Sequence, residues 1–150
     1  SRYITAVANK GTVYKLSLLD RMTDSQGNLL KDFTPEIRST IDVKDSTWNA
    51  VHTGMRRVIS DGSARKIFSD LEVDIAGKTG TAEENLARPA HALFVSYAPF
   101  NRPEISVTSV IPYGYSSGNA EELAGFIYAY YFDPDKLEGA SMTGNVNMSD

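Results

Sequence analysis

The sequence has 150 residues, of which 41% are hydrophobic and 23% are charged, which is the size and composition of one globular domain. Its net charge of −4 is spread along the chain, and this argues against nucleic acid as the main partner. The absence of cysteine excludes disulfides and thiolate metal sites, and no apolar run approaches the ~20 residues of a membrane span.

The chain opens with "RYITAVA", in which Ile4, Val7 and Ala8 share one helical face, and residues 9–11 form a helix stop. No capping lead-in precedes this face. We therefore expect the sequence to begin inside a helix and to be the C-terminal portion of a larger domain. Two strand-like runs follow on either side of a turn at residues 24–27.

The stretch "DSTWNAVHTGMRRVISDG" predicts the clearest helix, with Ser46 as its cap and Gly62 at its end. Gly54 lies inside this helix, where glycine costs roughly 1 kcal/mol relative to alanine. Its presence predicts that another backbone approaches closely there. The residues that share the apolar face are Trp48, Val51, Met55, Val58 and Ile59.

Three strands are predicted next, at residues 73–81, 91–99 and 104–112. The last two are close enough to form an antiparallel hairpin. A final helix is predicted over residues 119–132, and its apolar stripe would pack on the sheet. The members of that stripe are Ala120, Leu123, Ala124, Ile127 and Tyr131.

Helices before and after an antiparallel sheet predict an α+β fold. Residues 1–133 carry all the periodic patterns and would form the folded portion. Residues 134–150 are rich in Gly, Ser, Asn and Asp without any period, so we expect a flexible tail.

The segment "AGKTGTAE" lies where a predicted strand ends. Side chains alternate along a strand, so Lys78 would lie on the face opposite to Thr79 and Thr81. The two threonine hydroxyls would then point the same way and could grip a carboxylate, while Gly80 leaves room for a ligand or another backbone. Free N–H groups of the strand could donate to an oxyanion. A solvent-exposed edge strand with threonines chosen for β propensity would carry the same letters.

Four segments, in order and spacing, resemble the serine penicillin-recognising enzymes, and class B penicillin-binding proteins most closely. They are "VANKGTVYK", "WNAVHTGMRRVISDGSARKIF", "AGKTGTAE" and "HALFVSYAP". Lys-Thr-Gly is the third motif of that family, after Ser-x-x-Lys and Ser-x-Asn. The resemblance covers residues 1–133 and implies an antiparallel sheet packed with helices, as in β-lactamases and D,D-transpeptidases.

The resemblance also implies an activity. A serine would attack the D-Ala-D-Ala stem peptide of peptidoglycan, form an acyl-enzyme and pass the acyl group to a neighbouring amine, and β-lactams would acylate the same serine. Lys78 would line the cleft and support proton transfer, while Thr79 and Thr81 would hold the substrate carboxylate. The N–H of Thr81 would form half of the oxyanion hole, and Gly80 would permit close approach. No metal or cofactor is implied; the partners would be stem peptides and β-lactams.

Two short patterns imitate the missing motifs. "SARK" offers Ser63 and Lys66, and "SGN" offers Ser117 and Asn119, but both stand in the wrong order relative to Lys-Thr-Gly. Ser63 falls at a turn of the family pattern, and Ser117 suits a helix cap. We therefore expect the nucleophile upstream of this sequence and the chain alone to be inactive. The whole protein would be held by an upstream anchor at the extracytoplasmic face of a bacterial membrane.

Several alternatives remain at this stage. A β-lactam-sensing or other non-catalytic penicillin-binding domain would share the fold, and so would a secreted serine β-lactamase, which the segments above favour less. His52 and His91 suit packing or surface roles better than metal binding. The polar loop with Glu83, Glu84 and Arg88 suits solvent, with contact to a stem peptide as its alternative. Exposed sheet edges predict that the chain associates with itself.

Overall fold

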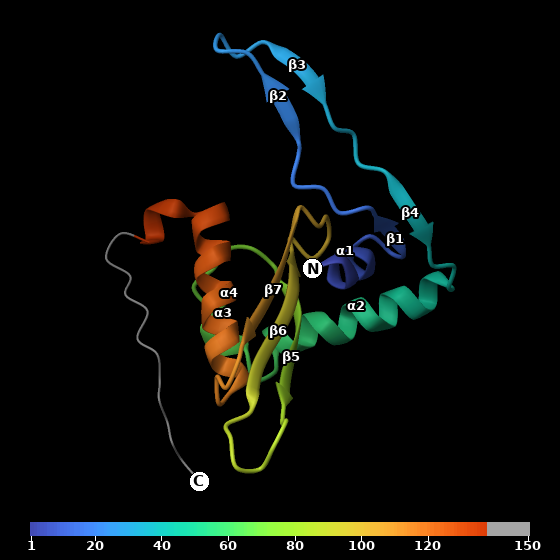
Figure 1. Ribbon diagram of the computed structural model, residues 1–150. Helices are drawn as coiled ribbons and strands as arrows, with labels where there is room; N and C mark the ends of the chain where they lie inside the picture. Colours follow the sequence, from blue (N-terminus) through green and yellow to red (C-terminus); the bar gives the residue numbers. More distant parts are fainter. Residues whose placement is uncertain (138–150) are drawn as a thin grey trace.

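The computed structural model describes residues 1–137, and Figure 1 shows a central sheet with helices on both sides and a long arm at one end. The predicted α+β class is confirmed. The elements, in chain order, are α1 (Arg2–Ala8), β1 (Thr12–Tyr14), β2 (Arg21–Thr23), β3 (Leu29–Asp32), β4 (Ile37–Thr40), α2 (Asp45–Ser60), α3 (Arg65–Phe68), β5 (Ala76–Ala82), β6 (His91–Ala98), β7 (Ile105–Ile111), α4 (Ser117–Phe132) and a 3-10 turn (Pro134–Leu137).

The central sheet has three antiparallel strands in the order β5-β6-β7. All seven residues of β5 pair with β6, from Ala76 opposite Tyr97 to Ala82 opposite His91. Strand β6 also pairs with β7 along its length. Strand β5 is therefore an edge strand of the sheet within the part of the chain that the structure describes.

The face of the sheet that α3 and α4 cover forms one core (Figure 1). Phe94, in the middle of β6, stacks on Phe68 of α3 with 5.5 Å between ring centroids. Tyr128 of α4 lies edge-on to Phe68, and its hydroxyl donates to Ser96 Oγ at 2.8 Å. All four side chains are buried, so this face is closed by aromatic packing and one internal hydrogen bond.

The opposite face is covered by α1 and α2. Ile4 and Val7 of α1 and Met55 of α2 pack against Ala76 and Tyr97 of the sheet. The predicted apolar faces of both helices are thus largely confirmed. Since both faces of β5 and β6 are covered near the start of β5, this end of the strand is firmly held in the body.

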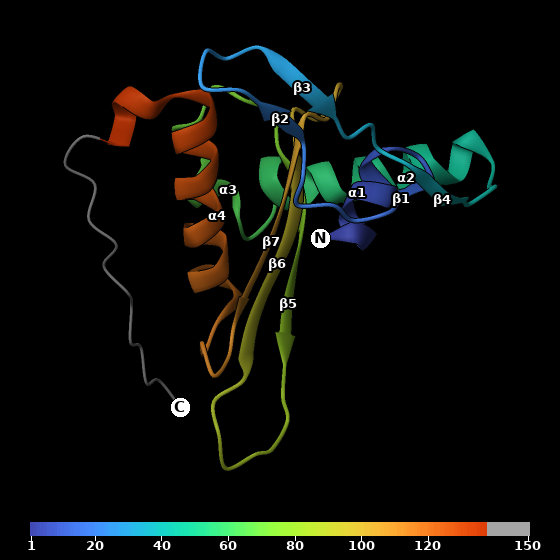
Figure 2. The same cartoon turned by 45° about the horizontal axis from the view of Figure 1, so that its top comes forward.

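Between α1 and α2 the chain runs out into an arm made of β1 to β4. Strand β1 pairs with β4, and β2 pairs with β3, each antiparallel. The predicted turn between the two runs is confirmed: Asp24 Oδ1 accepts from the N–H groups of Gln26 and Asn28. Figures 1 and 2 show β2 and β3 reaching away from α2 and the lower sheet.

Three expectations for α2 are wrong. The helix begins at Asp45, so Ser46 is inside it and is not its cap. The cap position is Lys44, which has extended backbone angles, and no side chain there accepts from the helix N–H groups. A methyl group added at Gly54 would meet no atom within 4 Å, so no backbone approaches there. Val51 is 40% exposed, because α2 packs through Trp48 and Met55 and turns Val51 outward.

The face of α4 is also different from the predicted stripe. Ala120, Ala124 and Tyr128, at intervals of four, are fully buried, whereas Ile127 and Tyr131 are exposed. Apolar residues surround almost the whole helix, so the sequence did not define a unique face. The helix begins at Ser117, and Ser116 rather than Ser117 is its cap, accepting from the N–H of Gly118.

The predicted tail begins with the 3-10 turn Pro134–Leu137. Residues 138–150, where most of that prediction falls, lie outside the described residues.

Candidate active site

The Lys-Thr-Gly-Thr segment lies within β5, on the open edge of the sheet. Lys78 and Thr81 are exposed, and Thr79 and Gly80 are half-buried. The expected strand is observed, although it begins at Ala76 rather than at Val73. The reason is that Asp74 is engaged by other elements, as its side chain pairs with Arg56 and its carbonyl accepts from the N–H of Phe100 at 2.7 Å.

The register shows which face each side chain occupies. Thr79 lies opposite Phe94 and Thr81 opposite Ala92, so both threonines belong to the face that α4 covers farther along the sheet. Lys78 lies opposite Val95 and shares the other face. The structure therefore separates Lys78 from the two threonines, as strand alternation requires.

The ammonium group of Lys78 folds back on its own strand. Its Nζ donates to the carbonyl of Thr79 at 2.8 Å, so this carbonyl is accessible from outside the β5–β6 ladder. Within a strand, the N–H and C=O of one residue point to the same edge, and the direction alternates from residue to residue. By this alternation the N–H of Thr81 points to the open edge, where it can donate to a bound group.

Two glycines of β5 lie where a side chain would crowd residues of β6. A methyl group added at Gly77 would lie 2.5 Å from Cζ of Phe94, which no real contact allows. At Gly80 it would lie 3.2 Å from Cβ of Leu93, a tight approach. Gly80 therefore relieves crowding with Leu93 of β6.

Arg56 of α2 fixes the beginning of β5. Its Nη2 forms an ion pair with Asp74, and its Nη1 donates to the carbonyl of Ile75 at 3.3 Å. No sequence pattern predicts this pair, because its two residues lie in different elements, 18 positions apart. Its effect is to join α2 to the strand that carries Lys-Thr-Gly.

Tyr113, which the sequence analysis missed, lies at the other end of β5, beside the loop that leads to β6. Its hydroxyl contacts Glu84 and Arg88 of the β5–β6 loop, and its N–H donates to His91. The loop residues that were expected to face solvent are thus exposed but joined to the turn after β7. No periodicity marks a tyrosine in a turn, so only the structure could reveal it.

The two imitations of the missing motifs lie elsewhere. Ser63 is in the turn between α2 and α3, and Lys66 is an exposed residue of α3. Asn119 is in the first turn of α4, where its Nδ2 donates to the carbonyl of Gly114 at 2.8 Å. Ser117 begins α4 and interacts with Glu121. Ser117 and Asn119 thus both serve the start of a helix.

Burial perturbs three ionisable groups near the sheet. The pKa of Tyr128 is raised because its hydroxyl is desolvated, and the hydrogen bond to Ser96 only partly offsets this effect. Burial raises the pKa of Tyr97 to about 12. Desolvation also raises the pKa of Glu121, against a lowering contribution from Ser117 and with a raising one from Glu122.

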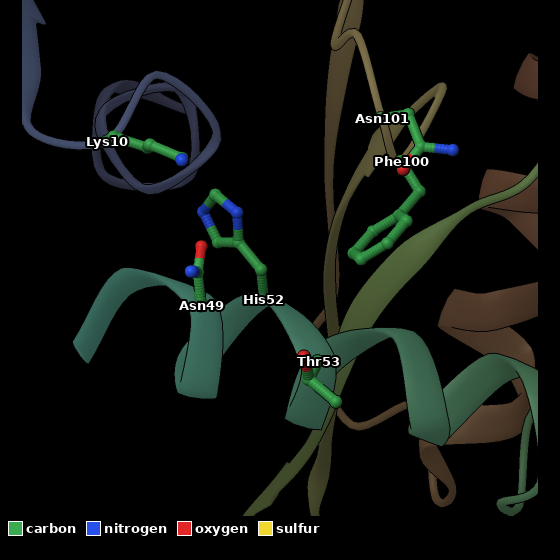
Figure 3. A pocket seen from close by; sticks show the side chains of 6 residues that line it. All are labelled: Lys10, Asn49, His52, Thr53, Phe100 and Asn101. Atoms are coloured by element: carbon green, nitrogen blue, oxygen red, sulfur yellow. The ribbon is translucent and has the colours of Figure 1, made fainter. Parts of the chain in front are cut away.

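One hollow of about 250 Å³ lies away from β5, between α2, the end of α1 and the β6–β7 turn. In Figure 3, His52 and Lys10 face Phe100 across it. The ring of His52 is buried beside Tyr97, and its Nε2 lies 2.8 Å from the carbonyl of Val7, which is a packing arrangement. Within residues 1–137, no three metal-ligating side chains of the His, Cys, Asp or Glu type gather. No described helix is long and apolar enough to cross a membrane.

Comparison with known protein families identifies one match. Residues 1–129 match the family described as the penicillin binding protein transpeptidase domain. Among relatives, the chain is 29% identical over 133 residues to penicillin-binding protein 2A of Bacillus subtilis, covering 79% of the chain and 19% of that protein. It is 35% identical over 107 residues to the peptidoglycan D,D-transpeptidase MrdA of Haemophilus influenzae, covering 60% of the chain and 16% of that protein. The chain therefore spans less than a fifth of the length of these relatives.

Solved structures show the same fold. Penicillin-binding protein 2B of Streptococcus pneumoniae matches 94% of the chain with a TM-score of 0.75 at 24% identity, over 25% of its own chain. PBP2 of Pseudomonas aeruginosa, solved in complex with WCK 5153, matches 93% of the chain with a TM-score of 0.66 at 28% identity, over 31% of its own chain.

Proposed function

Because this chain belongs to the penicillin-binding protein transpeptidase family, we propose that its strand β5 forms one wall of the active site of a peptidoglycan D,D-transpeptidase. The observation that carries the proposal is the placement of Lys78, Thr79, Gly80 and Thr81 on an open sheet edge. The name of the relative MrdA, a peptidoglycan D,D-transpeptidase, supports the reaction. Imipenem and penicillin G acyl-enzyme complexes of penicillin-binding protein A from M. tuberculosis, a neighbour in fold, support β-lactams as ligands.

The reaction is an acyl transfer. A serine hydroxyl attacks the carbonyl between the two terminal D-alanines of a stem peptide, a C–O bond forms, and the terminal D-alanine leaves with the proton. The amine of a second stem peptide then attacks the ester, which forms the cross-link and returns the proton to the serine. We propose that the nucleophile and its lysine come from another part of the protein. We also propose that the reaction takes place at the extracytoplasmic face of the membrane, because peptidoglycan lies there.

In this reaction, strand β5 binds the substrate carboxylate and stabilises the oxyanion. The hydroxyls of Thr79 and Thr81 donate to the terminal carboxylate of the stem peptide or of a β-lactam. The N–H of Thr81, which points to the open edge, donates to the oxyanion that develops on the attacked carbonyl. Lys78 supplies positive charge beside the cleft once its ammonium leaves the carbonyl of Thr79. Gly80 keeps the edge free of a side chain.

The test is the rate of β-lactam acylation of the transpeptidase that contains this chain. We expect Thr81→Val to lower the second-order acylation constant by roughly 10-fold to 100-fold, since a hydrogen bond to a charged group contributes about 1.5–3 kcal/mol. Thr108→Val is the matched control, because Thr108 is an exposed threonine of β7, at the other edge of the sheet. Acylation of Thr81→Val at the rate of the control would contradict the proposal.

A second measurement concerns the nucleophile. We expect the 150-residue chain to show no mass increase after incubation with excess penicillin, because Ser63 lies in an exposed turn between α2 and α3 and Ser117 interacts with Glu121 at the start of α4. A stoichiometric adduct that is lost in Ser63→Ala would overturn the assignment of the nucleophile to another part of the protein.

Among residues 1–137, β5 leaves one edge of the sheet unpaired, and the arm exposes apolar side chains. We propose that the isolated chain associates with itself in solution. Light scattering tests this, and a monodisperse monomer would contradict it.

A further inference from the structure

Two loops meet at the end of the sheet where β5 ends. They are residues 83–90, between β5 and β6, and residues 112–116, between β7 and α4. Tyr113 is their common contact. Its hydroxyl donates to Glu84 Oε2 at 3.1 Å and accepts from Arg88 Nη1 at 3.0 Å, while the guanidinium carbon of Arg88 lies 5.6 Å from the ring centroid.

His91, the first residue of β6, completes the cluster. Its Nδ1 accepts from the N–H of Tyr113 at 3.0 Å, and the two rings lie 4.8 Å apart. An imidazole that accepts at Nδ1 carries its proton at Nε2 when neutral. That Nε2 faces Glu84 Oε2 at 3.7 Å, so the ring lies between the turn and the loop and contacts both.

The turn itself is fixed against β6. Tyr113 and Tyr115 have φ angles of 55° and 62°, in the left-handed region that side chains rarely adopt. A methyl group added to Gly114 would lie 2.9 Å from Cβ of Ala92. The N–H of Tyr115 donates to the carbonyl of Ala90 at 3.1 Å. Such a conformation persists only where its surroundings hold it, and here the first residues of β6 do so.

The cluster acts on the candidate active site through strand pairing. Ala82 lies opposite His91, and Thr81 lies opposite Ala92. No described strand pairs with the other edge of β5, so at this end of the strand it is the pairing with the start of β6 that holds Thr81. We propose that His91 and Tyr113 are positioning residues that hold this end of β5 and thereby the N–H of Thr81. The proposal rests on the function assigned above.

Variants of His91 test this in the transpeptidase that contains the chain. We expect His91→Leu, which cannot accept from Tyr113, to lower the first-order acylation rate constant for a β-lactam by about 10-fold while the dissociation constant of the initial complex changes little, because small misplacements of a catalytic group slow the chemical step. His91→Asn can present its Oδ1 in place of Nδ1, and we expect it to restore most of the rate. Arg102→Ala is the control, since it breaks only an exposed pair with Glu104 near the opposite end of the sheet.

Amide hydrogen exchange provides a readout that does not need acylation. Gly80 and Ala82 have N–H groups that point towards β6 by the alternation described above, and we expect both to exchange faster in His91→Leu but not in His91→Asn. Should His91→Leu not fold, Tyr113→Phe removes only the contacts to Glu84 and Arg88, and we expect a smaller increase at the same amides.

The outcomes separate this proposal from the proposed function. If Thr81→Val slows acylation but His91→Leu changes neither acylation nor exchange, only the positioning role is wrong. The positioning role is also wrong if His91→Leu and His91→Asn slow acylation equally. If Thr81→Val has no effect and the exchange pattern still depends on His91, the assigned function fails while the structural connection stands.

Discussion

The body and the arm of this chain both carry large apolar side chains, but in very different surroundings. In the body, Phe94 and Tyr97 are fully buried between helices and sheet. In the arm, Leu18 is completely exposed, and Leu16 and Leu30 are about two-thirds exposed. A two-stranded hairpin alone is marginally stable in water, whereas a sheet covered on both faces forms its own core. The difference indicates that packing stabilises the body, while the arm depends on its turns or on a surface that covers it.

The largest expected effect separates the two regions directly. Phe94→Ala removes a ring that stacks on Phe68 in the core, and we expect the free energy of unfolding to fall by about 3–5 kcal/mol. Leu18→Ala should change it by less than about 0.5 kcal/mol, because the side chain has no burial to lose. Urea denaturation followed by circular dichroism measures both. A cost above roughly 1 kcal/mol for Leu18→Ala would show that the arm is packed in solution.

Two glycines allow a second comparison of the body and the arm. In the body, lack of space restricts substitution, whereas in the arm the backbone conformation restricts it. Gly77→Ala would place a methyl group 2.5 Å from Phe94, and we expect a loss of about 1–3 kcal/mol in global stability. Gly27, in the arm, has open space around it but a φ of 86°. Gly27→Ala should speed amide exchange within the β2–β3 hairpin and leave global unfolding unchanged.

Gly54→Ala is the control for these glycines. It adds a methyl group inside a helix where no atom lies within 4 Å, so we expect a gain of about 0.5–1 kcal/mol. A loss of stability would mean that the solvent face of α2 is covered in solution. Equal losses for Gly77→Ala and Gly54→Ala would remove the packing argument for β5.

Sequence reasoning succeeded where one periodic signal dominated. The three strands and the hairpin of β6 and β7 followed from short apolar runs and turns, and strand alternation correctly placed Lys78 on the face opposite to Thr79 and Thr81. It failed for α4, where apolar residues all around the helix hid the face that packs, and for Gly54, where a glycine has no partner. It could not find the contacts of Tyr113, because pairs between distant loops leave no periodic trace.

Two buried tyrosines allow a finer test within the body. Tyr128 donates to the buried Ser96, so Tyr128→Phe leaves that hydroxyl without its donor and should cost about 1–2 kcal/mol. The hydroxyl of Tyr97 is buried without a hydrogen-bond partner among residues 1–137. Tyr97→Phe should therefore raise the stability at neutral pH by about 1 kcal/mol. Thermal or urea unfolding of the two variants gives opposite signs if this assignment of the hydroxyls is correct.

Tyr97 also makes the stability depend on pH, with a defined sign. The folded state raises the pKa of Tyr97 to about 12, above its ordinary value of 10. Between these values the folded state keeps a proton that the unfolded chain releases, so stability decreases as the pH rises through this range. We expect Tyr97→Phe to show a smaller decrease between about pH 10 and pH 12 than the parent chain. An identical slope for both would show that the hydroxyl is solvated in the folded state.

The smallest expected effects come from two ion pairs, one in each region. Lys15 and Glu36 form an exposed pair between the two sides of the arm, and Glu36→Gln should leave global unfolding unchanged within error. Arg56 and Asp74 join α2 to the start of β5, and the side chain of Arg56 is 27% exposed. Asp74→Asn should therefore lower the free energy of unfolding by up to about 1 kcal/mol, and this difference from the parent chain should shrink as the salt concentration rises. Since Asp74 precedes the strand that carries Lys-Thr-Gly, the same variant should also speed exchange at Ala76, whose N–H points towards β6 by strand alternation, while Glu36→Gln should not. If the two variants behaved alike, α2 would not anchor the strand, and the body would hold β5 by its strand pairing and apolar core alone.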